Sequence, residues 1–244
     1  MKGLGAIIPI GTALIFGVGL GWVAKGSHLT FFFSHYVPAL VTLLAAFLGA
    51  KYAFDFQSNR EKEEQRKKDM MHGELAIFKL SLMLNSLLSY QREIIEPVRN
   101  NPNAFLEMPP TIPRVKEHST INFDSLAFLL RSDGKNILGE LAMEVLRYDA
   151  AFLSINERSK VHRDEAQPTL ESRGLINDGN HSDESIISAL GDRLYFTLCN
   201  ATDQVIYHVD STIVSMEEVA AKLTILLEEQ FPDENITGIS LPKK

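Results

Sequence analysis

Residues 3–24 read GLGAIIPIGTALIFGVGLGWVA, and residues 35–50 read HYVPALVTLLAAFLGA. The first stretch runs for 22 residues without a charge. A helix of roughly 20 apolar residues crosses a bilayer, and a spanning segment must satisfy its own backbone groups. The sequence therefore predicts two transmembrane helices, joined by residues 25–34 into an antiparallel hairpin.

The basic residues predict the orientation of this hairpin. The connection carries only Lys25, whereas six basic residues follow the second stretch: Lys51, Arg60, Lys62, Arg66, Lys67 and Lys68. Because loops rich in Lys and Arg stay in the cytoplasm, we expect both termini there and a multi-pass membrane protein. A cleaved signal peptide fits less well, since Trp22 stands where a small residue is needed before the cut.

Small residues recur at every fourth position in both apolar stretches. The predicted helix-association face consists of Gly5, Ala13, Gly17 and Gly21 in the first helix and Ala45, Gly49 and Ala53 in the second. Such small-xxx-small patterns let helix backbones approach closely. Two interpretations stay open: the two faces pack against each other within one hairpin, or they also join copies of the chain into a homo-oligomer.

Charged residues flank the second stretch, and each group has two interpretations. Lys51 and Asp55 stand four residues apart, which suits either an interfacial ion pair or the polar collar of an assembled pore. Arg60, Lys62, Arg66, Lys67 and Lys68 form a juxtamembrane basic group. They belong either to a solvated helical face or to a site close to anionic lipid head groups.

Beyond residue 57 the sequence predicts a cytoplasmic α-helical domain. Leu138, Leu141, Val145, Tyr148, Phe152 and Ile155 alternate by three and four, as in the core of a helical bundle or coiled coil. We expect an all-α fold in which three long helices and a short helix form an antiparallel bundle. The expected segments are a hairpin at 1–57, an extension helix at 58–99, a proline-rich loop at 100–123, a bundle at 124–231 that includes 74–99, and a tail at 232–244.

Shorter signals predict how the bundle is connected. Asp124 is placed as an N-cap, with Phe123 and Phe128 as a hydrophobic staple around a short helix. Residues 170–181 are rich in glycine and asparagine and are predicted to form an exposed turn, and the last helix is predicted to begin after Ser182.

The charge and the single cysteine limit the functions that the chain can have. A formal net charge of −7 argues against general nucleic-acid binding, which needs a basic face. Cys199 is alone, so an intramolecular disulfide and a cysteine zinc cluster are excluded. We expect it to be a small buried apolar side chain.

No motif in the sequence predicts catalysis, and we expect no catalytic residue, no cofactor and no metal. The tripeptide at 162–164, His-Arg-Asp, lacks the rest of a kinase signature and is interpreted as a solvated helix end. His162 with Glu165 and His181 with Glu184 reverse the Glu-x-x-His order of di-iron bundles. The sequence therefore predicts a non-enzymatic protein.

The layout as a whole resembles the two-transmembrane effectors of bacterial anti-phage defence systems, including those encoded beside retron reverse transcriptases. The phrases at 121–126, INFDSL, and 155–158, INER, are similar to stretches of bacterial membrane proteins of this shape. The resemblance implies a toxin in the bacterial inner membrane, restrained by a cytoplasmic protein or nucleoprotein such as a reverse transcriptase with its msDNA. Its release would damage the membrane.

Two hypotheses of different classes follow from the sequence. In the first, the chain is an effector whose hairpins associate in the lipid bilayer and permeabilise it once a restraining partner dissociates. In the second, the hairpin is only an anchor, and the helical domain is a scaffold that docks a soluble complex.

Overall fold

The computed structural model describes residues 29–112, 121–131, 135–175, 182–236 and 238, and within these residues every element is helical. The all-α prediction is confirmed for this part of the chain. The long helices are α2 (Leu29–Tyr90), α4 (Lys135–Val161) and α6 (Asp183–Gln230). The short elements are the π-helices η1 (Gln91–Ile95) and η3 (His162–Ala166), the 3-10 helix η2 (Asp124–Arg131), α3 (Ala104–Glu107) and α5 (Gln167–Ser172).

The chain divides into two compact units, residues 1–65 and 66–244, and the division falls within α2. In the first unit, α2 is long and apolar enough to cross a membrane. Among the described residues it is the one helix with this property. We name residues 36–50 the apolar window, and none of them is buried. The predicted hairpin is therefore found only as a single apolar helix, because its first half, at 3–24, lies outside the described residues.

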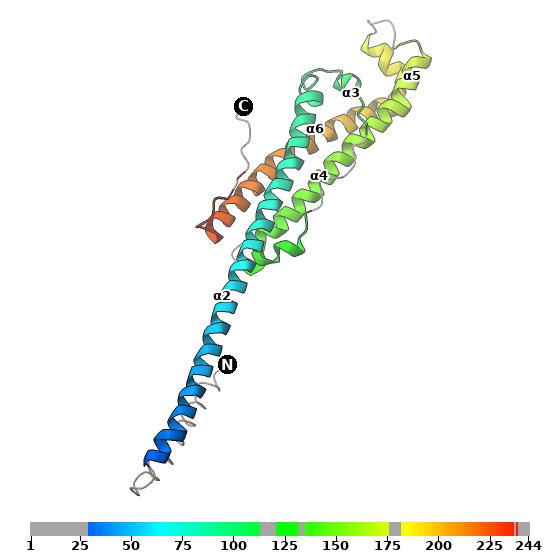
Figure 1. Cartoon of the computed structure of the whole chain (residues 1–244). Helices are drawn as coiled ribbons and strands as arrows, with labels where there is room; N and C mark the ends of the chain where they lie inside the picture. The colour runs from blue at the N-terminus through cyan, green and yellow to red at the C-terminus, as the bar shows by residue number, and fades with distance from the viewer. Residues whose placement is uncertain (1–28, 113–120, 132–134, 176–181, 237, 239–244) are drawn as a thin grey trace. The chain divides into compact units, whose positions relative to one another are not determined.

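The second unit is a bundle in which α6 runs antiparallel to both α2 and α4. Gly73 of α2 meets Leu227 of α6, and Arg99, farther along the chain, meets Asp210. Likewise, α4 pairs Glu140 with Lys222 and Arg158 with Thr202. Figure 1 shows these three helices with α3 and α5 at one end of the bundle.

The main core of the bundle lies between the three long helices. The alternation by three and four in α4 does face it: Leu141 and Ile155 are buried, and Leu138, Val145 and Phe152 are partly buried against the same cluster. α2 supplies Leu80 and Leu87, both completely buried. The residues at these spacings lie on one side of each helix, so burying them removes a continuous apolar stripe from water.

A second apolar cluster forms where α3, η3, α5 and the start of α6 meet. Its buried members are Phe105, Ala166, Leu170, Leu190, Leu194 and Leu198. Leu170 had been predicted to open an exposed turn, and this prediction is wrong, because Leu170 is in α5 and is buried. The turn consists of Arg173 and Gly174, and the φ of 71° at Gly174 is a conformation that glycine adopts without strain.

Two local predictions about the loop region also need correction. The segment 100–123 is not loop throughout, because α3 makes a single turn between Pro102 and Pro109. Asp124 is the first residue of η2 and not the residue before it; the side chain of Asn122 accepts a hydrogen bond from the Asp124 backbone N–H at 3.1 Å. The side chain that accepts a backbone N–H at the start of this helix is therefore Asn122, two residues before the predicted Asp124.

Helix α6 begins where the sequence predicted, since the Ser182 side chain accepts a hydrogen bond from the Ser185 backbone N–H. The helix is broken at Gly191, whose φ of 73° and ψ of 155° are not helical. The first two turns of α6 are therefore not continuous with the rest of the helix. Leu190 and Leu194, on either side of the break, are both buried in the second apolar cluster.

Candidate functional site

Part of the predicted helix-association face lies on α2. Ala45, Gly49 and Ala53 are exposed, and a Cβ atom built on Gly49 meets nothing within 4 Å. Gly5, Ala13, Gly17 and Gly21 lie outside the described residues. The pairing of the two faces therefore stays a prediction.

The predicted charged groups are also on α2. Lys51 and Asp55, the proposed collar, are exposed. All five members of the juxtamembrane group are exposed as well, and Arg60 pairs with Glu64 at 3.0 Å; the five are Arg60, Lys62, Arg66, Lys67 and Lys68. Arg66 differs from the other four in its contacts, because its guanidinium lies 5.8 Å from the centre of the Phe231 ring and 3.4 Å from the Asp233 carboxylate. Arg66 therefore packs against the end of α6 within the bundle.

The site that sequence reasoning missed is a polar clamp near the C-terminal end of α4. We name as the α4 clamp the three residues Arg158, Ser159 and His162, which are buried. Spaced at i, i+1 and i+4, they lie on one side of the helix. Each of them binds a residue of the segment 105–111, which comes some 50 residues earlier in the chain.

The hydrogen bonds of the clamp hold backbone groups that no helix satisfies. Arg158 Nη2 donates to the Phe105 carbonyl at 2.9 Å, and His162 Nε2 lies 2.9 Å from the Leu106 carbonyl. The Ser159 hydroxyl accepts from the Thr111 backbone N–H at 3.1 Å. Buried backbone groups are costly without partners, so these contacts fix α3 and the loop after it on the bundle.

Arg158 is completely buried, and burial lowers the pKa of its guanidinium to about 10. A group with that pKa is still protonated at neutral pH. Its Nη1 atom has no hydrogen-bond partner among the described residues, and Nε lies 3.4 Å from the Thr202 hydroxyl. The α4 clamp thus keeps a positive charge inside the bundle, held mainly by neutral oxygen atoms.

The folded chain disfavours the charged form of His162, because its pKa is lowered from the ordinary value. Burial is the main cause that lowers its pKa, the nearby Arg158 charge lowers it further, and the hydrogen bond to Leu106 opposes both effects. Because a carbonyl only accepts, Nε2 carries the proton, and Nδ1 has no partner among the described residues. His162 had been interpreted as part of a solvated helix end; that interpretation is wrong, since its side chain is buried against α3.

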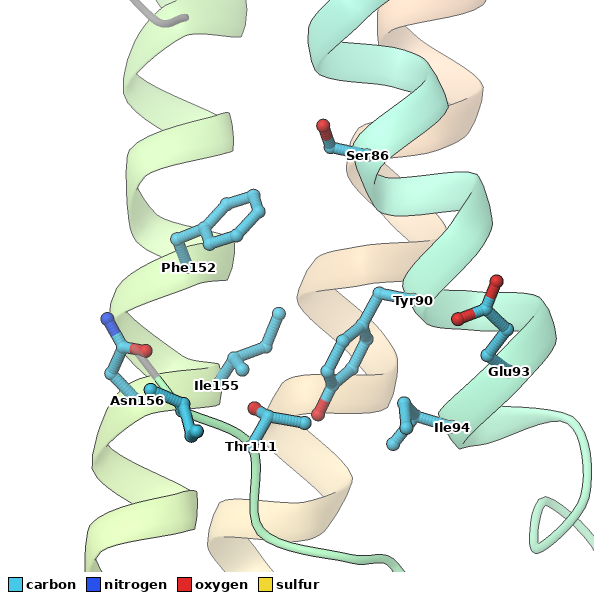
Figure 2. A pocket seen from close by; sticks show the side chains of 9 residues that line it. Ser86, Tyr90, Glu93, Ile94, Thr111, Phe152, Ile155 and Asn156 are labelled. Atoms are coloured by element: carbon cyan, nitrogen blue, oxygen red, sulfur yellow. The ribbon is translucent and has the colours of Figure 1, made fainter. Parts of the chain in front are cut away.

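A pocket of about 360 Å³ opens beside the clamp, between the end of α2, the loop after α3, and α4. Figure 2 shows the Tyr90 ring reaching across it, with the hydroxyl beside Thr111. The lining combines apolar side chains with hydroxyl, carboxylate and amide groups: Ser86, Tyr90, Glu93, Ile94, Thr111, Ile112, Phe152, Ile155 and Asn156. Burial raises the pKa of Tyr90, so the hydroxyl stays protonated at neutral pH.

Both π-helices lie next to this region. Glu93 and Ile94 of the pocket belong to η1, and His162 of the clamp begins η3. A π-helical turn places one extra residue in a helix and changes the direction of the following side chains, and such turns are frequent at functional sites. No pattern in the sequence predicted either π-helix, because the helical periodicity continues through both.

Hydroxyl groups and one imidazole gather in this region. Tyr90, Thr111 and Ser159 supply hydroxyls, and the neighbouring His162 directs its protonated nitrogen at a backbone carbonyl. Within the described residues, no group of three or more His, Cys, Asp and Glu side chains is placed to hold a metal ion. Cys199 is half-buried against the second cluster, and burial raises the pKa of its thiol, which disfavours the reactive thiolate.

Comparisons with protein-family models, with curated proteins and with solved structures find no match to this chain.

Proposed function

We propose that the chain is a membrane-anchored, non-enzymatic effector that cytoplasmic partners restrain and that damages the inner membrane when released. One observation carries the proposal. A single helix, α2, contains an apolar window with no buried residue and, from Gly73 onward, a face that forms part of a bundle core. A helix that is apolar on all sides needs lipid or protein around it, and none of the described residues buries this window.

The bundle is the part of the chain that suits a cytoplasmic partner. Its outer surface carries large exposed apolar side chains on all three long helices, among them Phe78, Leu146 and Tyr207. Exposed apolar side chains of this size become buried when a partner covers them. The same observation supports the second candidate function, a membrane anchor that docks a soluble complex, because both functions require a bound partner.

A toxicity experiment separates the effector from the scaffold. The chain is expressed without any neighbouring gene, and membrane potential is followed with a voltage-sensitive dye. An effector depolarises the cells, and replacing Gly17 and Gly21 with Leu relieves depolarisation without lowering the amount in the membrane, because bulky residues prevent close helix approach. A matched control replaces Leu14 and Leu20 with Ile, which keeps the bulk and leaves toxicity unchanged.

The result that contradicts the effector is a harmless wild-type chain that is nevertheless recovered in the membrane. Such a chain fits the scaffold. Full toxicity of the Gly17→Leu and Gly21→Leu variant contradicts only the glycine-face mechanism, since depolarisation itself is still observed.

A further inference from the structure

The outer side of α2 carries an apolar stripe that the bundle does not use. We name as the outer stripe Met71, Leu75, Phe78 and Leu82. The first three are 56%, 47% and 58% exposed, and Leu82 is half-buried. They lie on the side of the helix opposite to Leu80 and Leu87, which are in the core. Helix α2 is therefore apolar on two opposite sides within the bundle.

The spacing of the outer stripe is that of a coiled coil. Its residues follow one another at intervals of four, three and four, which places Leu75 and Leu82 at a positions and Met71 and Phe78 at d positions of a heptad. Knobs of this kind insert between four residues of a second helix. The stripe ends at Lys68 on one side and Asn85 on the other, so it is two heptads long.

The charges beside the stripe identify the second helix. In this register Glu74 is at a g position and Lys79 at the following e position. In a parallel two-stranded coiled coil, a g residue lies beside the e residue five positions later in the partner helix. A second copy of α2 in the same direction therefore brings Glu74 of each chain to Lys79 of the other, which gives two complementary pairs.

We propose that the outer stripe joins two copies of this chain through a parallel coiled coil of α2. The proposal rests on the membrane anchoring proposed above, for two reasons. Copies inserted with the same topology are related by a two-fold axis along the membrane normal, which makes their α2 helices parallel. Four side chains per copy bury less than a stable soluble interface needs, and anchoring in one membrane raises the effective concentration that compensates for this.

Disulfide cross-linking of the full chain in isolated membranes tests the proposal. Single cysteines replace Met71 or Leu82 in a Cys199→Ser background, and copper phenanthroline is the oxidant. In a parallel pair each position meets its own copy, so both variants form covalent dimers. In an antiparallel pair Met71 meets Leu82, and neither single variant cross-links. The control is Ile225→Cys on α6, which is 56% exposed, equal to Met71, and is expected to stay monomeric.

Two further sets of variants examine the residues that carry the argument. Phe78→Glu adds a charge to an exposed position, so the bundle folds, and the Met71→Cys cross-link is expected to fall by about ten-fold because a d position loses its apolar contact. Glu74→Lys places a lysine of each chain beside Lys79 of the other chain and is expected to reduce the Met71→Cys cross-link by about five-fold. Adding Lys79→Glu makes the pairs complementary again and restores the cross-link. Circular dichroism checks that each variant keeps its helix content.

Each outcome decides one of the proposals. Membrane-bound chains that do not cross-link at Met71 and Leu82, or that cross-link equally at Ile225, overturn the coiled coil and leave the anchoring intact. If Glu74→Lys reduces the cross-link and Lys79→Glu does not restore it, the parallel register is overturned. Recovery of the chain in the soluble fraction contradicts the anchoring and overturns the coiled coil with it.

Discussion

The apolar window of α2 and the core of the bundle are both apolar, but only the bundle core contains buried charged residues. In the window, the charged residues nearest to the apolar stretch, Lys51 and Asp55, are exposed and lie toward its end. In the bundle, Arg158 and Glu144 are buried to 0% and 2% exposure. Folding supplies oxygen and nitrogen partners to a bundle core, whereas hydrocarbon supplies none.

The partners of the buried charges show how the bundle achieves this. Glu144 accepts from Arg147 at 2.7 Å on one oxygen and from the Ser215 hydroxyl at 2.7 Å on the other. Arg158 has the Phe105 carbonyl and the Thr202 hydroxyl. A bundle can therefore contain a charge wherever another element brings a fixed dipole to it.

The largest expected effect comes from placing charge in the window. Leu44→Arg with Phe47→Arg costs roughly 5–7 kcal/mol of insertion free energy, from about 2.5–3.5 kcal/mol for each Arg at a helix centre. We expect the variant α2 not to insert into the membrane. A reporter fused after Lys244, which reports a cytoplasmic location in the wild type, should then no longer report the cytoplasm. The same two charges at Leu75 and Phe78, which are exposed on the bundle, are the control and leave the reading unchanged. An unaltered reading for the window variant contradicts a spanning role of α2.

A smaller effect is expected from removing the charge that the bundle does accept. Arg158→Ala leaves a cavity and frees the Phe105 carbonyl, so the free energy of unfolding should fall by about 3 kcal/mol. Arg158→Met fills the space without burying a charge, and its loss should stay below about 1.5 kcal/mol. Denaturant unfolding in detergent measures both variants. If Met is as damaging as Ala, hydrogen bonding rather than volume controls this position.

The smallest effect is a pH dependence that His162 gives to the bundle. Its pKa is lower in the folded chain than in the unfolded chain, so the unfolded chain binds more protons below the ordinary pKa of 6.5. The stabilisation is complete above pH 6.5, and we expect it to be lost progressively as the pH falls from there toward the folded pKa. Thermal unfolding between pH 7.5 and 5.5 measures it. His162→Gln, which still donates toward the Leu106 carbonyl, should flatten this part of the profile, and an unchanged slope assigns it to another group.

The sequence by itself determined where the long helices form and which of their faces are apolar. The uncharged stretch at 37–50 and the alternation from Leu138 to Ile155 are both local information, and the alternation follows the 3.6-residue turn of a helix. For the same reason the cap at Ser182 was readable in advance. The charge skew and the small-residue spacing are equally local, but the orientation and association that they predict stay predictions.

The tertiary structure alone decided what the polar residues of α4 do. Arg158 lies 53 residues from Phe105 and His162 lies 56 residues from Leu106, and no periodic pattern relates positions so far apart. His162 looked like a solvated helix end because its neighbours Arg163 and Asp164 are charged and form a pair on the surface. Its burial follows from α3, a single turn between prolines that brings two backbone carbonyls to α4. A hydrogen-bond donor takes its role from the acceptor that folding brings to it, and that acceptor is not encoded next to it in the chain.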